Sequence, residues 1–123
     1  MSLRVLIIDD EEDTREIAKM SLEILGGLNV IEAVNGKVGI DIASREKPDV
    51  ILLDMMMPIM DGPATLEALR QSEHTKDIPV IFLTAKAMTS EIEKLKRMGA
   101  RGVLTKPFDP TTLASQMKAI LEG

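Results

Sequence analysis

Carboxylate, hydroxyl and amino groups stand directly after the short apolar runs of this sequence. The residues in these positions are Asp9, Asp10, Asp54, Thr84 and Lys106. Side chains that follow the carboxyl ends of parallel strands meet along one edge of a sheet, which is where open α/β sheets bind their ligands. If the apolar runs are such strands, three carboxylates, a hydroxyl and an ammonium group converge on one site.

The chemistry of this group of side chains favours a metal and a phosphoryl group. Three carboxylates that lie close together repel one another, and a cation would stabilise their charged forms. Hard carboxylate oxygens without histidine or cysteine select Mg²⁺ rather than zinc. One carboxylate could then attack phosphorus and form an acyl phosphate. Mg²⁺ and Lys106 would neutralise the phosphoryl oxygens, and the Thr84 hydroxyl could donate a hydrogen bond to one of them.

Strand-like and helix-like segments alternate along the chain, which is the pattern of a parallel α/β sheet. Strands are predicted at residues 5–8, 28–34, 50–53, 80–83 and 101–105. A helix is predicted after each strand, and the first one carries an apolar stripe made of Ile17, Met20, Ile24 and Leu25. Right-handed crossovers favour a flavodoxin-like, doubly wound (βα)₅ fold with a parallel five-stranded sheet of order 2-1-3-4-5.

Length and composition fit one domain over residues 1–123, with residues 1–3 and 122–123 interpretable as cloning remnants. The chain has no cysteine, which excludes disulfides, thiolate zinc sites and a cysteine nucleophile. A net charge of −5, with no Trp or Tyr, disfavours nucleic-acid binding by this domain. We expect a cytoplasmic domain without membrane contact, because no apolar run approaches the length that spans a bilayer.

Four short motifs carry a resemblance to a known family. They are Asp9-Asp10, Asp54-Met55-Met56-Met57-Pro58 with Asp61-Gly62, Thr84-Ala85, and Lys106-Pro107-Phe108. Each is weak alone, but they occur in this order at successive predicted strand ends. Over essentially its whole length the chain resembles the receiver domain of bacterial two-component response regulators, of the kind found in chemotaxis.

The resemblance implies a role for each matching residue. Asp54 would accept the phosphoryl group, Thr84 would be the switch hydroxyl, and Lys106 would pair with Asp54 or the phosphoryl group. Asp10 would ligate Mg²⁺ directly and Asp9 would lie close to the ion, often through water. Met56 would supply a backbone carbonyl to the metal. The peptide bond between Lys106 and Pro107 is typically cis in this family.

Three further positions are expected to tune the switch. Val103 stands where the family often has the Tyr or Phe that rotates on phosphorylation. Met56 and Lys86, two residues after Asp54 and Thr84, occupy variable positions that affect the lifetime of the phosphoryl group. The neighbouring acids Glu11, Glu12 and Asp13 are interpreted as carboxylates that favour a helix N-terminus.

The implied function is a phosphorylation-controlled signalling switch, which is not an enzyme beyond catalysing its own phosphorylation and dephosphorylation. The phosphodonor would be a sensor histidine kinase, a phosphotransfer protein or a small phosphodonor. The output would be an effector protein or a fused output domain, reached through the face made by the fourth helix, fifth strand and fifth helix. Dimerisation on phosphorylation is left open.

Three other functions are weighed against this one. A phosphatase that passes through aspartyl phosphate needs an acid two residues after its nucleophile, and Met56 cannot transfer a proton. A flavin binder would need aromatic residues to stack the ring, and the chain has only two phenylalanines. A degenerate receiver that acts as an interaction scaffold would fail to take a label from acetyl phosphate, although all acceptor and metal residues are present.

Overall fold

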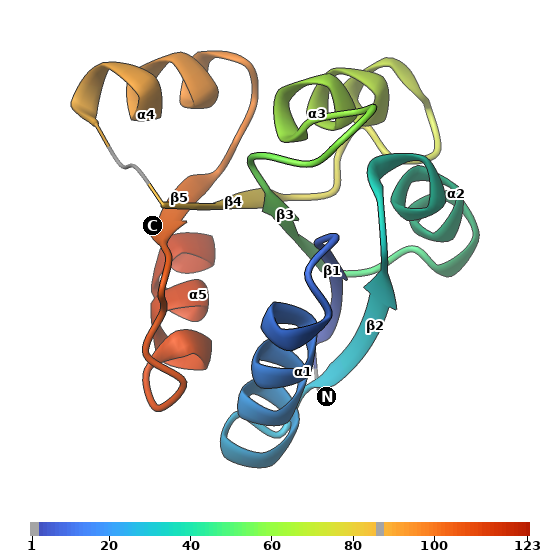
Figure 1. The fold of residues 1–123 in the computed structure, drawn as a ribbon. Helices are drawn as coiled ribbons and strands as arrows, with labels where there is room; N and C mark the ends of the chain where they lie inside the picture. Colours follow the sequence, from blue (N-terminus) through green and yellow to red (C-terminus); the bar gives the residue numbers. More distant parts are fainter. Residues whose placement is uncertain (1–2, 86–87) are drawn as a thin grey trace.

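The computed structural model describes residues 3–85 and 88–123. Five parallel strands form one sheet in the order β2-β1-β3-β4-β5, which confirms the predicted order (Figure 1). The strands are β1 (Arg4–Ile8), β2 (Asn29–Ala33), β3 (Val50–Asp54), β4 (Val80–Thr84) and β5 (Gly102–Thr105). Every strand of the sheet is therefore joined to the next by a crossover, as parallel pairing requires.

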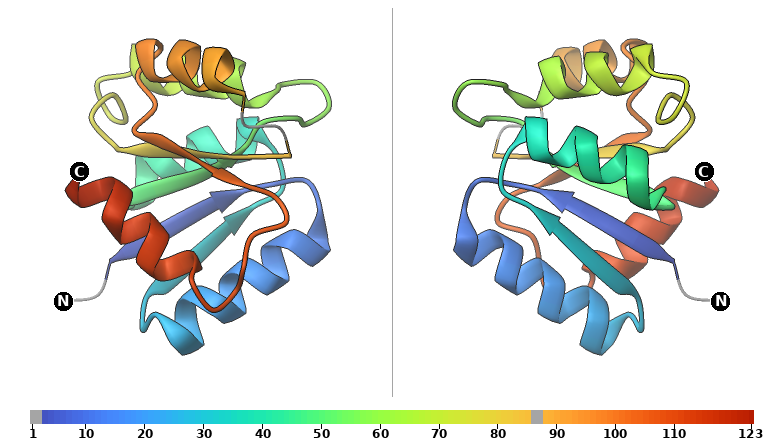
Figure 2. Two further views of the ribbon diagram at one scale, coloured as in Figure 1. Left: turned by 90° about the vertical axis from the view of Figure 1, so that its left-hand side faces the viewer. Right: turned by 90° about the vertical axis from the view of Figure 1, so that its right-hand side faces the viewer.

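Helices cover both faces of the sheet. They are α1 (Glu12–Met20), the π-helix η1 (Ser21–Leu25), α2 (Gly36–Glu46), α3 (Gly62–Gln71), α4 (Thr89–Arg97) and α5 (Leu113–Glu122). Helices α1 and α5 lie on one face, and α2, α3 and α4 lie on the other (Figure 2). Among the described residues, no helix is long and apolar enough to cross a lipid bilayer.

The two-sided cover explains why the central strands are apolar throughout. Successive strand residues point to opposite faces, so that Ile7 packs among the side chains on the α1 and α5 side while Ile8 packs on the opposite side. All residues of β3 and β4 are buried. Polar side chains that must meet a ligand can therefore lie only at the ends of these strands.

The apolar stripe predicted along the first helix does not face the core. Its four residues, between Ile17 and Leu25, are 47% to 73% exposed. The residues that pack in the core on this side of the sheet are Ala18 and Leu22. Ser21 is also buried, and its hydroxyl donates to the carbonyl of Pro110. The continuous helix also passes into a π-helix at Ser21, which changes the helical period and the direction of the side chains that follow.

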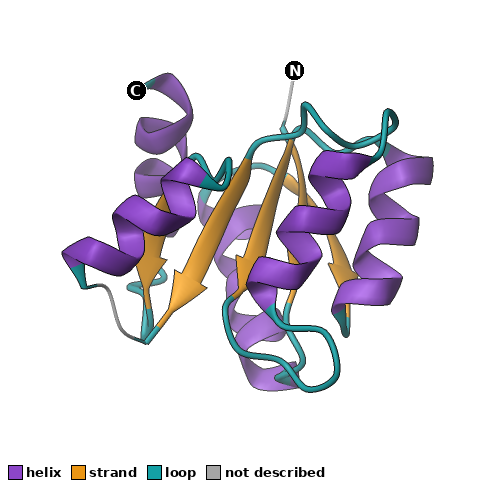
Figure 3. Ribbon diagram, turned by 90° about the horizontal axis from the view of Figure 1, so that it is seen from above, coloured by secondary structure: helices purple, strands orange, loops and turns teal. Residues whose placement is uncertain are grey.

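The loop between β3 and α3 folds back against the end of β3, and Figure 3 shows it at the edge where the strands end. Asp61 is the N-cap of α3, and its carboxylate accepts the amide hydrogen of Ala64 at 2.9 Å. The amide of Gly62 donates to the Met55 carbonyl at 2.9 Å. A Cβ atom on Gly62 would lie 2.5 Å from the Asp54 carbonyl oxygen, so only glycine permits this approach.

Replacing Gly62 with alanine is therefore expected to destabilise the domain by about 2 kcal/mol, the usual cost of forcing extra atoms into a packed region. Urea unfolding followed by circular dichroism measures the change. Gly123→Ala, where the nearest atom to the added carbon is 3.3 Å away, is the matched control and should unfold like the wild type. An unchanged urea midpoint for Gly62→Ala would contradict this account of the loop.

Candidate functional site

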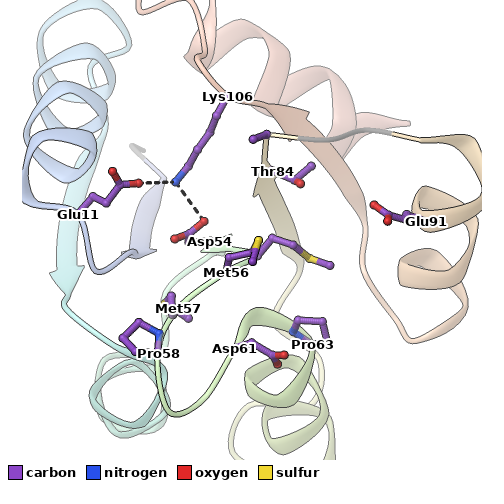
Figure 4. A pocket seen from close by; sticks show the side chains of 12 residues that line it. Glu11, Asp54, Met56, Met57, Pro58, Asp61, Pro63, Thr84, Glu91 and Lys106 are labelled. Atoms are coloured by element: carbon purple, nitrogen blue, oxygen red, sulfur yellow. Dashed lines mark hydrogen bonds and ion pairs between the residues drawn. The ribbon is translucent and has the colours of Figure 1, made fainter.

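The ammonium group of Lys106 joins the carboxylates predicted at two strand ends. Its Nζ atom lies 2.8 Å from Oδ2 of Asp9 and 3.1 Å from Oδ1 of Asp54. A third carboxylate, that of Glu11, lies 3.5 Å away. Figure 4 shows Lys106 reaching across the site between Glu11 and Asp54. The ends of β1, β3 and β5 thus meet through a single cation.

Burial decides the electrostatics of these groups. Asp9 is 0% exposed and Asp54 is 4% exposed. Burial raises the pKa of Asp54 to about 6, although the hydrogen bond from Lys106 lowers it, and the charge of Asp9 adds to the rise. Burial by itself would lower the pKa of Lys106, but the hydrogen bonds to Asp9 and Asp54 outweigh it and leave that pKa raised.

An open cleft of about 830 Å³ gives solvent access to this cluster. It is lined by Glu11, Asp54, Met55, Met56, Met57, Pro58, Asp61, Pro63, Thr84, Ala85, Glu91 and Lys106. The end of β5 is fixed beside β4 because the Lys106 amide donates to the Thr84 carbonyl at 2.8 Å. Met56, at 82% exposure, lies at the mouth of the cleft. Asp54 can therefore be reached by a small group or by the side chain of another protein.

The structure brings most, though not all, of the predicted site residues together. Asp54, Thr84 and Lys106 line the same cleft, and the buried Asp9 is joined to them through Lys106. Asp10 is exposed, and the carboxylate oxygens that lie within 4.8 Å of one another belong to Asp9, Glu11 and Asp54. In the arrangement described, Glu11 is thus nearer to the cluster than Asp10.

Sequence reasoning missed this position of Glu11. Its interpretation as a helix N-terminal acid is correct in part, because Glu11 is the N-cap of α1. Its amide also donates to Oδ1 of Asp9 at 2.9 Å, which turns the chain back toward the site. An aspartate side chain that accepts a hydrogen bond from the amide two residues ahead forms a recognised type of turn. In the sequence, the run Asp9-Asp10-Glu11 is the signal that could have indicated it.

The donor atoms fit Mg²⁺. Three carboxylate oxygens within 4.8 Å of one another are hard ligands, and no histidine or cysteine belongs to this group among the residues described. The cleft beside them leaves room for water or phosphate oxygens, which Mg²⁺ usually keeps in its coordination shell. A divalent cation would also offset the repulsion between Asp9 and Asp54, which among the described residues share one ammonium partner, Lys106.

The sequence also singles out the Lys106–Pro107 bond, Val103 and Lys86. The Lys106–Pro107 peptide bond is cis, as the resemblance implied. Val103 lies on β5, paired in register with Phe82, and packs partly buried against the core on the α4 side. Lys86, the predicted tuning residue after Thr84, lies outside the described residues.

The pKa of Asp54 predicts a pH dependence of stability. The folded state binds this proton more tightly than the unfolded chain, so the stabilisation is fully present below the ordinary value of 3.8 and is lost as the pH rises through about 6. We therefore compare the free energy of unfolding of Asp54→Asn with that of the wild type, without Mg²⁺, at about pH 4 and about pH 7. From the lower to the higher pH, the difference should move in favour of the variant by up to about 3 kcal/mol.

Urea unfolding at both pH values, with a chelator present, measures this change. Asp41→Asn, which removes an exposed carboxylate on α2 instead, is measured alongside as the control for the loss of a carboxylate far from the site. If the Asp54→Asn difference is the same at both pH values, the Asp54 carboxyl is not held in the unfavourable surroundings described.

Comparison with known proteins agrees with this geometry. The chain is 39% identical over 120 residues to Protein PilH of Pseudomonas aeruginosa, covering 98% of both chains. It is 38% identical to the DNA-binding dual master transcriptional regulator RpaA of Synechocystis, covering 96% of this chain but 48% of RpaA. The crystallised chemotaxis response regulator CheY4 of Vibrio cholerae superposes with a TM-score of 0.90 at 30% identity, covering 98% of this chain and 99% of CheY4.

These relatives differ in length but share this domain. The chain spans about half the length of several transcriptional regulators that it matches, RpaA among them, and nearly all of PilH. The family model described as the response regulator receiver domain matches residues 5–118, which include every strand-end residue discussed above. The chain belongs to the response regulator receiver family.

Proposed function

We propose that this domain is a phosphorylation-controlled switch that accepts a phosphoryl group on Asp54 in the presence of Mg²⁺. The observation that carries the proposal is the setting of Asp54, which is 4% exposed, lies 3.1 Å from the Lys106 ammonium and lines an open cleft. Structural ion pairs in a core have no need of such a cleft. A carboxylate held beside a cation at the end of a cleft fits an acceptor for an anionic group.

Each site residue has a role in this reaction. A carboxylate oxygen of Asp54 forms a bond to phosphorus while the bond from phosphorus to the donor breaks. Lys106 pairs with the Asp54 carboxylate before the transfer and with the phosphoryl oxygens after it. The Thr84 hydroxyl donates a hydrogen bond to one of those oxygens. Asp9, Asp10, Asp54 and the carbonyl of Met56 would hold Mg²⁺, with Glu11 in reach. The ion supplies positive charge that stabilises the transferring phosphoryl group.

Membership of the family supports a proposal for the donor and the output. We infer that a sensor histidine kinase or a phosphotransfer protein phosphorylates the domain in the cytoplasm, and that small phosphodonors can replace it. The output is an effector protein or a fused output domain, since relatives such as RpaA are about twice as long. The exposed side chain of Met56 lies at the mouth of the cleft and offers no strong hydrogen-bonding group to orient water, which favours a long-lived phosphoryl group.

The readout face is the one made by α4, β5 and α5. Thr84 ends β4 just before α4, and Lys106 directly follows β5. Helix α4 has a single buried residue among those described, Leu95, and no side-chain hydrogen bond caps its N-terminus. A helix anchored at so few points can shift when the charge near Thr84 changes. Val103 provides a small aliphatic side chain there, so we expect small repacking movements rather than the rotation of a ring.

The direct test of the proposed function is labelling by phosphoramidate. Intact mass should rise by one phosphoryl group when Mg²⁺ is present and should not rise when a chelator removes it. Asp54→Asn should abolish the label, because the acceptor carboxylate is gone. Asp61→Asn, which changes another carboxylate of the same cleft and keeps the helix cap, should still label. Equal labelling of Asp54→Asn and wild type would refute the assignment.

The readout face is tested by NMR with Mg²⁺ and beryllofluoride, which mimics the phosphoryl group. Backbone shift changes outside the site should concentrate in α4, β5 and the start of α5, because these elements adjoin Thr84 and Lys106. The variant Asp54→Asn, which cannot bind the mimic through its carboxylate, serves as the control. Shift changes confined to α1 and α2 would contradict the proposed face.

A further inference from the structure

Arg15, in the second turn of α1, reaches back to the loop that carries the site carboxylates. Its guanidinium Nη1 donates to the backbone carbonyl of Asp9 at 2.8 Å. Its Nε atom lies 3.3 Å from Oε1 of Glu32 on β2. The Arg15 side chain is only 12% exposed and does not line the cleft. Its described contacts to the site are therefore with the main chain and not with the reacting groups.

The Asp9 backbone that Arg15 contacts determines where the carboxylates lie. The Asp9 amide donates to the Ala33 carbonyl at 3.1 Å, which ties the end of β1 to β2. Beyond this point the chain leaves the sheet, and the Asp9 side chain accepts from the Glu11 amide and from Lys106. Arg15 fixes the carbonyl at the turning point. The orientation of the next residues, Asp10 and Glu11, depends on that carbonyl plane.

The charge of Arg15 is largely balanced by its partner. Glu32 pairs with Arg15 at 3.3 Å and approaches Lys19 at 3.9 Å. Lys19 shares the partner but makes no hydrogen bond to Asp9, and its side chain is 43% exposed. Arg15 therefore differs from Lys19 in its hydrogen bond to the Asp9 carbonyl and not in its charge.

We propose that Arg15 is a positioning residue for the Mg²⁺ site, holding the loop after β1 so that its carboxylates are arranged before the ion binds. This inference rests on the proposed function. Groups that orient metal ligands without touching the metal typically change metal affinity by about 10- to 100-fold when they are removed. Arg15 acts on two acidic residues at once, because Asp10 and Glu11 both follow the one carbonyl that it holds.

The test compares two double variants that alter charge equally. Arg15→Gln with Glu32→Gln removes one cation and its anion together with the contact to Asp9. Lys19→Gln with Glu32→Gln removes the same charges but leaves the contact between Arg15 and the Asp9 carbonyl. Calorimetric titration with MgCl₂ should give an affinity at least about tenfold weaker for the first variant and within about twofold of wild type for the second.

Phosphoramidate labelling separates positioning from a direct part in the reaction. The Arg15→Gln, Glu32→Gln variant should label slowly at low Mg²⁺ and reach the wild-type rate at saturating Mg²⁺, since Arg15 does not touch the acceptor. Equal Mg²⁺ affinities of the two double variants would overturn the inference. If, in that case, the wild type still binds Mg²⁺ and labels on Asp54, the proposed function stands.

A wild type that neither binds Mg²⁺ nor labels would overturn both the proposed function and this inference. Circular dichroism shows whether each variant is folded. If the Arg15→Gln, Glu32→Gln variant is not, Arg15→Lys replaces it in the titration. The shorter lysine keeps the charge but cannot hold Glu32 and the Asp9 carbonyl together, so Mg²⁺ affinity should again fall, and an unchanged affinity would overturn the inference.

Discussion

The ammonium group of Lys106 is the interaction on which the site depends. It lies between the buried carboxylates of Asp9 and Asp54, at 2.8 Å and 3.1 Å. Carboxylates taken out of water are costly unless a cation pairs with them, and two of them share this single lysine. Among the described residues, the site therefore has more negative charge than Lys106 alone can balance. Binding of a divalent ion, or a change in the partner of Lys106, therefore changes the electrostatic energy of these buried carboxylates strongly.

The sheet order makes this pairing possible. Strand β1 lies beside β3, so that Asp9 and Asp54 end up next to each other, while β5 lies at the edge beyond β4. Lys106 follows β5, and its long side chain extends back past the end of β4 to reach both acids. Helices cover both faces of the strands, so the edge where the strands end is the place that remains for polar chemistry. Gly62 then lets the next loop close against the Asp54 carbonyl.

Much of this arrangement could be predicted from the sequence. The apolar runs indicated the strands, their parallel order followed from the alternation with helices, and the polar residues after each run indicated the site. These features depend on local patterns and on the geometry of parallel sheets. The structure brought Asp54, Thr84 and Lys106 together at the predicted edge.

Other features depend on tertiary contacts that no local pattern contains. The stripe between Ile17 and Leu25 has the spacing of a core face, yet the small Ala18 and the buried Leu22 occupy that face instead. Glu11 joins the site because the Asp9 side chain turns the backbone. The contact of Arg15 with the Asp9 carbonyl joins residues whose helix and strand directions are set by the fold.

The most direct measurement of the central claim is an NMR titration of the Asp54 side-chain carboxyl carbon. Burial beside Asp9, only partly offset by Lys106, predicts a midpoint near the pKa of about 6 in the metal-free domain. Adding MgCl₂ should lower that midpoint, because the ion favours the ionised carboxylate. A midpoint at the ordinary aspartate value of 3.8 that does not respond to MgCl₂ would contradict the claim that Asp54 is a buried acid whose charge Lys106 only partly stabilises.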